Sequence, residues 1–214
     1  MAHPSDRDAS VERIDAECFL LRQALSLEEQ ANLCEYIHSR DKTPANQPRA
    51  MMPAPKTLLL GDDDHPNIQY GPGDASLVND MVDRSAAVLK SEGLSVMGGF
   101  DMCGYTALSM ATIRYEAPTG RFPPHVDHCQ DSLVCLASLG RTANFMVKGS
   151  SNEVSRFKLY SGDVLVFNAS SAANVLHGVE SIDESASETG EALAGKFPTL
   201  QGHRYGVQCR MYFS

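Results

Sequence analysis

The sequence contains no tryptophan, no apolar run of membrane-spanning length and no apolar stretch near its first residue. A transmembrane helix needs about 20 consecutive apolar residues, and a secretory signal needs an apolar core. We therefore expect an intracellular protein, in the cytoplasm or the nucleus, with no signal peptide and no transmembrane segment. Six cysteines are present without any Cys-x-x-Cys pair, a spacing that argues against a zinc framework or a disulfide scaffold.

Positive charge is also scarce, since 18 Lys and Arg residues stand against 27 Asp and Glu residues and give a net charge of −9. Proteins that bind duplex nucleic acid usually carry a basic footprint, so this balance disfavours a duplex binder and leaves room only for a local basic groove. The length of 214 residues and a hydrophobic content of 43% suffice for one domain with a sizeable core. We expect this domain to be a monomer.

The N-terminal third predicts a disordered start, one strand and two helices. Residues 1–12 are polar, and residues 18–21 have the composition of a short strand. Ser26 and Glu29 form a capping box, after which apolar residues recur at helical spacing to about residue 39. A second apolar period over residues 77–89 predicts a helix that ends at Gly93.

Two segments between these helices are open to a functional interpretation. Residues 41–56 contain four prolines and must form a loop, which is either a lid over a site or a plain connector. Three consecutive aspartates and His65 can suggest a metal site. We favour a solvated turn, because consecutive residues do not converge on one point.

Strand periodicity begins at Leu108 and continues to the end of the chain. Residues 132–139 are apolar on both faces and are predicted to be buried. The remaining strands are expected at 145–148, 156–160, 164–167, 175–179 and 204–213. Many short strands after two helices predict a mostly β fold with flanking α: a cupin-like jelly roll on whose sheet the two N-terminal helices pack.

Residues 181–203 interrupt the strand pattern. Ser, Ala, Gly and Glu dominate the segment up to Gly195, and no apolar period is visible. Such a composition buries little apolar surface, so we expect a flexible acidic insert.

The segment from Pro123 to His128 holds the most informative motif. His125 and Asp127 are two residues apart, and on a strand this spacing points both side chains to one face, with His128 on the other face, where it can lie near a substrate. His177 follows about fifty residues later, just after a turn and a buried strand. Two histidines and one carboxylate form the facial triad that suits Fe(II) and O2 chemistry. The alternative is a set of structural histidines, because the short motif arises easily by chance.

The last strand carries two arginines, Arg204 and Arg210, with the same parity. At about 3.3 Å per residue their Cα atoms lie roughly 20 Å apart, so their long side chains can flank a short dicarboxylate. The planar guanidinium matches a carboxylate with two parallel hydrogen bonds. The alternative is ion pairing on an exposed edge strand.

The order of these motifs resembles the AlkB family of 2-oxoglutarate- and Fe(II)-dependent dioxygenases. The resemblance covers about residues 108–213. It rests on Tyr115, Pro118, His125-x-Asp127, Gly162-Asp163-x-Leu165-x-Phe167, His177-Gly178-Val179 and the Arg204-x5-Arg210 spacing. It implies a double-stranded β-helix core over these residues, within one domain of residues 13–214. The implied reaction uses Fe(II), 2-oxoglutarate and O2, splits 2-oxoglutarate to succinate and CO2, and hydroxylates a substrate C–H bond.

The resemblance also assigns roles to six residues. His125, Asp127 and His177 are implied as the iron ligands and catalytic residues. Arg204 is implied to bind the 5-carboxylate of 2-oxoglutarate, and Arg210 to lie near its 1-carboxylate and Asp127. Tyr115 is implied to hydrogen-bond the same co-substrate, although a core tyrosine is the alternative.

The chain departs from the family at several positions. Ile113 and Gly206 stand where relatives often have asparagine, so the co-substrate contacts must be fewer or different. Cys129 stands where nucleobase demethylases often carry an acidic residue, with Asp131 two residues later, and Ala173 replaces an arginine. Without tryptophan, a flipped base would have to stack on another ring.

The leading functional hypothesis is oxidative demethylation of N-alkylated bases in single-stranded DNA or RNA. A second is oxidation of a protein side chain or a small molecule, which the acidity and Cys129 favour. A third is a non-enzymatic cupin-like metal-binding protein. The cations near the site are Arg114, Arg121, Arg141, Lys148, Arg156 and Lys158.

Overall fold

The computed structural model describes residues 10–40, 56–58, 68–70, 76–94 and 96–213. The strands are β1 (Ser10–Asp15), β2 (Cys18–Arg22), β3 (Lys56–Leu58), β4 (Ile68–Tyr70), β5 (Val96–Met97), β6 (Phe100–Asp101), β7 (Ala107–Glu116), β8 (Phe122–His125), β9 (Ser132–Lys148), β10 (Val154–Leu159), β11 (Val164–Asn168), β12 (Leu176–Ala186) and β13 (His203–Tyr212). The α-helices are α1 (Leu27–Arg40), α2 (Ser76–Ser91) and α3 (Glu188–Lys196), and the 3-10 helices are η1 (Met102–Gly104) and η2 (Pro198–Leu200).

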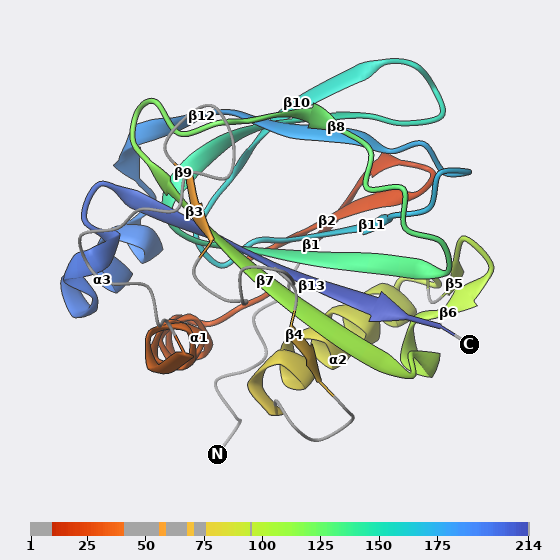
Figure 1. Cartoon of the computed structure of the whole chain (residues 1–214), viewed down its shortest axis with the longest axis horizontal. Helices are drawn as coiled ribbons and strands as arrows, with labels where there is room; N and C mark the ends of the chain where they lie inside the picture. Colours follow the sequence, from red (N-terminus) through yellow and green to blue (C-terminus); the bar gives the residue numbers. More distant parts are fainter. Residues whose placement is uncertain (1–9, 41–55, 59–67, 71–75, 95, 214) are drawn as a thin grey trace.

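The strands form two facing layers (Figure 1). The major layer runs β1-β2-β11-β9-β13-β7-β3, with β4 also paired to β7. In the smaller layer β9 lies between β10 and β12, and β12 also pairs with β8. This arrangement is a jelly roll, so the predicted mostly β fold is confirmed.

The long strand β9 belongs to both layers. Residues up to 140 pair with β11 and β13, and residues from 141 onward pair with β10 and β12. Gly140 marks the change of layer, with φ +88, in the left-handed region that favours glycine. A Cβ there would lie 2.8 Å from the carbonyl oxygen of His203. The bend therefore depends on a residue without a side chain.

Helices α1 and α2 cover the outer face of the major layer (Figure 1). The capping box that begins α1 is confirmed, because the Glu29 carboxylate accepts from the Ser26 backbone N–H at 2.8 Å and Ser26 Oγ accepts from the Glu29 backbone N–H at 3.3 Å. Apolar residues of both helices join one buried cluster with β7, β9, β11 and β13. A second buried cluster, which includes Tyr115 and Phe167, fills the space between the two layers.

The expectation of a flexible insert at residues 181–203 is wrong. The segment contains the end of β12, the whole of α3 and η2, and Leu193 and Leu200 are fully buried. One of its glycines serves close packing, since a Cβ on Gly190 would collide with the backbone oxygen of Gly140. A helix of nine residues with one small apolar face contains too few apolar repeats for a helical period to be detected in the sequence.

Two further outcomes concern the N-terminal third. Residues 10–12, expected to be disordered, belong to β1 and pair with β2. The loop over residues 41–55 and the turn at Asp62 to His65 lie outside the described residues. Within the described ranges, no helix is long and apolar enough to cross a membrane.

We predict that Leu193→Ala lowers the free energy of unfolding by about 2–5 kcal/mol, because it leaves a cavity beneath α3. Urea unfolding followed by circular dichroism measures this loss. Glu184→Ala, at an exposed position of the same segment, is the matched control and should stay within about 0.5 kcal/mol of the parent. Equal stability of the two variants would restore the interpretation of the segment as a loose insert.

Candidate functional site

The structure brings His125, Asp127 and His177 together. The two histidines come from β8 and β12 of the smaller layer, and Asp127 comes from the irregular segment that follows β8. His125 ends β8 and lies directly opposite His177 of β12 in the strand register. Asp127 lies beyond the end of β8. The prediction that His125 and Asp127 share one face of a strand therefore does not hold for Asp127. His128 also lies in the irregular segment after β8, with φ +53, and its Nδ1 contacts the hydroxyl of Ser171 at 3.0 Å.

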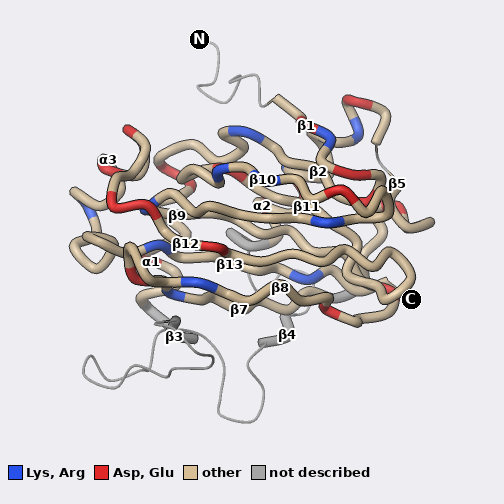
Figure 2. Tube along the Cα trace, turned by 90° about the horizontal axis from the view of Figure 1, so that it is seen from above, with Lys and Arg blue, Asp and Glu red and all other residues tan. Residues whose placement is uncertain are grey.

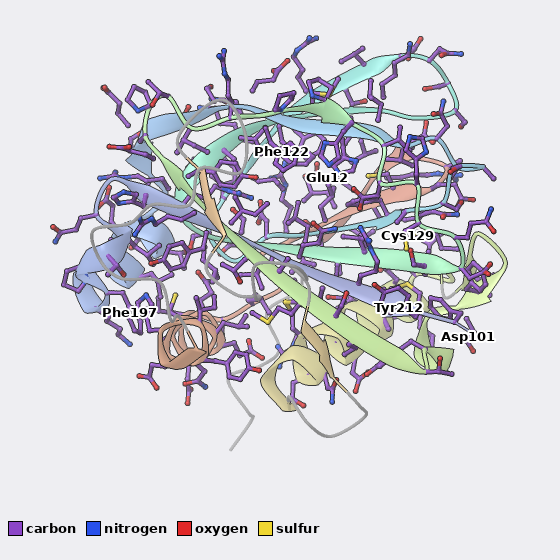
Figure 3. The ribbon with its side chains drawn as sticks, viewed as in Figure 1. Glu12, Asp101, Phe122, Cys129, Phe197 and Tyr212 are labelled. Atoms are coloured by element: carbon purple, nitrogen blue, oxygen red, sulfur yellow. The ribbon has the colours of Figure 1, made fainter. Side chains whose placement is uncertain are left out.

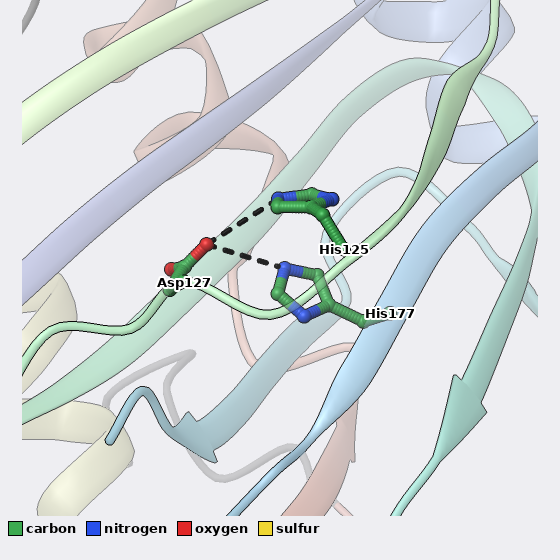
Figure 4. Close-up of side chains that lie close together, drawn as sticks. All are labelled: His125, Asp127 and His177. Carbon is green, nitrogen blue, oxygen red and sulfur yellow. Dashed lines mark ion pairs between the residues drawn. The ribbon is translucent and has the colours of Figure 1, made fainter. Parts of the chain in front are cut away.

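One oxygen of Asp127 faces both imidazole rings (Figure 4). Asp127 Oδ1 lies 3.3 Å from His125 Nε2 and 3.8 Å from His177 Nε2, and the potential ligand atoms all lie within 4.8 Å of one another. Each ring directs its Nδ1 to a backbone carbonyl two residues earlier, at 3.0 Å in both cases. Such a bond fixes the ring and leaves Nε2 free to bind a metal.

The protonation states also suit a cation. Burial alone would raise the pKa of Asp127, but the hydrogen bond to His125 and the charges of His177 and Arg210 lower it to about 2. Burial lowers the pKa of His177, which favours the neutral ring. A metal needs a carboxylate and neutral imidazoles, so the shifts of Asp127 and His177 both favour the forms that bind a metal.

The second oxygen of Asp127 is held by β13. Arg210 donates to Asp127 Oδ2 at 2.6 Å, and Gln208 donates to the same atom at 3.1 Å. Both bonds leave Oδ1 free for a metal and fix the plane of the carboxylate. The sequence prediction missed Gln208, although its parity on β13, shared with both arginines, placed it on the same face.

Arg204 is buried without an anionic partner among the described residues. Only 1% of its surface is exposed; its Nε donates to Ser138 Oγ at 3.1 Å, and its Cζ lies 5.3 Å from the centre of the Tyr115 ring. Its Nη2 has no hydrogen-bond partner in the described part of the chain, and neither does Nε of Arg210. Burial lowers the pKa of Arg204 to about 10 and raises that of Tyr115 to about 12.

These orphaned donors define what the site can bind. A buried guanidinium without a counter-ion is costly, and a ligand carboxylate would supply the missing charge and acceptors. Arg204 and Arg210 lie on the same face of β13, and the second of them already contacts Asp127. The geometry therefore fits a dicarboxylate that reaches from Arg204 toward the metal-binding residues.

The exposed side of the site lies at His125. Its side chain is 34% exposed, against 7% for each of Asp127 and His177. The ring of Phe122, labelled in Figure 3, stacks on His125 with centroids 4.3 Å apart. A hollow of about 340 Å³ on the same two strands is lined by residues 121–124 and 178–180. Sequence reasoning gave Phe122 no role.

Comparison with known proteins agrees with this geometry. The model of the family described as the 2OG-Fe(II) oxygenase superfamily matches residues 17–210. The chain belongs to this superfamily. It is therefore a dioxygenase, an oxidoreductase that uses Fe(II), 2-oxoglutarate and O2. No curated protein matches the sequence.

Three solved structures show the same fold at low identity. OsALKBH1 is 18% identical with a TM-score of 0.63, over 93% of this chain and 100% of that one. A prolyl-4-hydroxylase of Pseudomonas putida is 11% identical with a TM-score of 0.55, over 92% and 93%. The viral collagen prolyl hydroxylase of Paramecium Bursaria Chlorella virus-1 is 11% identical with a TM-score of 0.50, over 92% and 90%. The fold of this oxygenase is thus AlkB-like and shared with prolyl hydroxylases.

We predict that His125→Ala or Asp127→Ala abolishes Fe(II) binding and succinate formation while the fold is retained, because an open triad depends on all three ligands. Anaerobic calorimetric titration of the metal and circular dichroism test this. His128→Ala is the matched control, since its ring contacts Ser171, and it should bind the metal like the parent. Undiminished succinate formation in either ligand variant would contradict the assignment.

Proposed function

We propose that this oxygenase holds Fe(II) on His125, Asp127 and His177, binds 2-oxoglutarate between Arg204 and Arg210, and demethylates N-alkylated bases in single-stranded DNA or RNA. The observation that carries the co-substrate site is the buried guanidinium of Arg204, whose Nη2 has no hydrogen-bond partner among the described residues, on the strand that also fixes Asp127. The substrate class is supported by the likeness to OsALKBH1, which spans the whole of that chain.

In this mechanism the chain's own residues bind and orient the reactants. Arg204 takes the 5-carboxylate of 2-oxoglutarate as a two-pronged donor, and the Tyr115 phenol beside it remains protonated and can donate a further hydrogen bond. Gln208 and Arg210 fix Asp127, while Pro123 and Val175 fix the two imidazole rings through their carbonyl groups.

Bound Fe(II), with 2-oxoglutarate and O2, supplies the oxidant that removes hydrogen from a substrate C–H bond. The co-substrate leaves as succinate and CO2. A hydroxylated N-methyl group then loses formaldehyde and returns the base. The deep burial of Arg204 and His177 keeps water from this half of the site, whereas the exposed His125 leaves the other half open to a substrate.

The charge distribution supports a short single strand over a duplex (Figure 2). Of the six cations named from sequence, Arg141, Arg156 and Lys158 are paired with Glu191, Glu180 and Asp183. Arg121 is exposed at the edge of the hollow beside Phe122 and has no ion pair within the described residues. Such a site can contact a few phosphates and lacks the extended footprint of a duplex binder.

A second candidate function, hydroxylation of a protein side chain or a small molecule, is favoured by two observations. The fold is shared with prolyl hydroxylases, and half of the expected basic groove is neutralised by carboxylates. Cys129, labelled in Figure 3, also stands where a base-reading acidic residue is expected by resemblance.

We predict that Arg204→Ala raises the KM for 2-oxoglutarate at least about 30-fold, because truncating one member of a buried charge pair costs about 2 kcal/mol or more. The KM of Arg204→Lys should lie between the KM of Arg204→Ala and that of the parent, since lysine keeps the charge and loses the planar fork. Succinate formation against 2-oxoglutarate concentration measures both. An unchanged KM in both variants would make the arginine structural.

We predict weak, salt-sensitive binding of a methylated single-stranded oligonucleotide and no preference for duplex. Each phosphate contact contributes about −0.7 to the slope of log K against log salt, so Arg121→Gln should flatten the slope by about that amount. Arg156→Gln, whose parent side chain is paired with Glu180, is the matched control and should leave the slope unchanged. Fluorescence anisotropy from low to moderate salt measures this. No affinity for nucleic acid at low salt would favour a protein or small-molecule substrate.

A further inference from the structure

The guanidinium of Arg204 lies over a glycine of its own strand. Arg204 and Gly206 share the inner face of β13, and a Cβ placed on Gly206 would stand 2.8 Å from Nη1 and 3.6 Å from Cζ of Arg204. The same Cβ would stand 3.4 Å from Cε2 of Tyr115. The arginine side chain therefore occupies the space that a side chain at position 206 would fill.

The surroundings hold the guanidinium in this place. Ser138, whose hydroxyl accepts from Arg204 Nε, lies directly opposite Gly206 in the register of β9 and β13. Tyr115, in register with Arg204 on β7, closes the other side. The guanidinium is thus fixed between a ring, a hydroxyl and a bare stretch of backbone.

Glycine at position 206 leaves space for the guanidinium and is not needed for the backbone conformation. Its φ does not fall in the left-handed region, so alanine can adopt the same backbone without strain. The atom nearest to an added Cβ is the far end of a side chain, so the guanidinium, not the strand, would move.

We infer that Gly206 sets the length of the co-substrate pocket and thereby selects 2-oxoglutarate over longer 2-oxo diacids. The inference rests on the proposed placement of 2-oxoglutarate against Arg204. Because the guanidinium of Arg204 lies over Gly206, it is displaced from the Cα of Arg204 by about two residues along the strand, roughly 6.6 Å. The displacement is toward Arg210 and Asp127. A side chain at position 206 pushes the cation back and lengthens the pocket.

One methylene group is the natural test of this length, because 2-oxoadipate exceeds 2-oxoglutarate by one CH2. A pocket that is fitted to one chain length discriminates against an extra methylene by about 10–200-fold. The parent protein should show a preference of this order, and Gly206→Ala should reduce it by about tenfold, through weaker binding of 2-oxoglutarate and unchanged or tighter binding of 2-oxoadipate.

The experiment measures the affinity of both 2-oxo acids by calorimetry on Zn(II)-loaded protein, which binds without turnover, and the two KM values on the iron enzyme. Gly195→Ala is the matched control, because an added Cβ there meets no atom within 4 Å. Ser138→Ala, which removes the acceptor of Arg204 Nε, is the second variant and should reduce the same preference without changing the space at position 206.

The outcomes separate this inference from the function on which it rests. A parent that binds 2-oxoglutarate, together with an unchanged preference in Gly206→Ala, overturns the role of Gly206 alone. If Gly206→Ala does not fold, an unchanged preference in Ser138→Ala overturns the fixed position of the Arg204 guanidinium, and with it the inference about pocket length. A parent that binds neither acid overturns the proposed co-substrate site itself.

Discussion

The site depends on one buried carboxylate that stays ionised between two layers of strands. Desolvation opposes the charge of Asp127, and the surrounding imidazoles and Arg210 outweigh it. The two oxygens of Asp127 have separate partners. Oδ2 accepts hydrogen bonds from side chains of β13, and Oδ1 faces the histidines of β8 and β12. Asp127 therefore connects the two histidines to the polar side chains of β13, and a loss of either set of partners would disturb both.

The fold supplies these partners through a single strand that changes layer. Strand β9 pairs with β13, which carries Arg204, in its first half and with β12, which carries His177, in its second half. Both residues are therefore positioned by pairing with the same strand. Gly140 makes the bend, and Gly190 lets α3 approach it closely. Helix α3, in the segment expected to be flexible, thus packs against the point at which β9 passes from one layer to the other.

Residue type and spacing indicated the cluster of His125, Asp127 and His177, whereas Tyr115 received its role only from the resemblance to a known family. Sequence reasoning predicted the jelly roll and both early helices, because period two in strands and a capping box are local signals. It failed for α3, where burial of Leu193 comes from contacts distant in sequence and the composition suggested disorder. It also missed Gln208, although the parity of this residue with both arginines placed it on their face of the strand. It missed Phe122 because a ring stacked on His125 has no signature in spacing.

The two halves of the site differ in how tightly the protein specifies its ligand. Around Arg204 and Arg210, where we place 2-oxoglutarate, buried donors lack partners among the described residues. A ligand of the wrong length or charge would leave these donors unpaired, which gives strong discrimination. Around His125, where we place the substrate, the structure offers an exposed imidazole, one stacked phenyl ring and a hollow beside Arg121. These groups of the described chain can select a substrate through shape and through contacts made at the surface, in keeping with a fold that this oxygenase shares with prolyl hydroxylases.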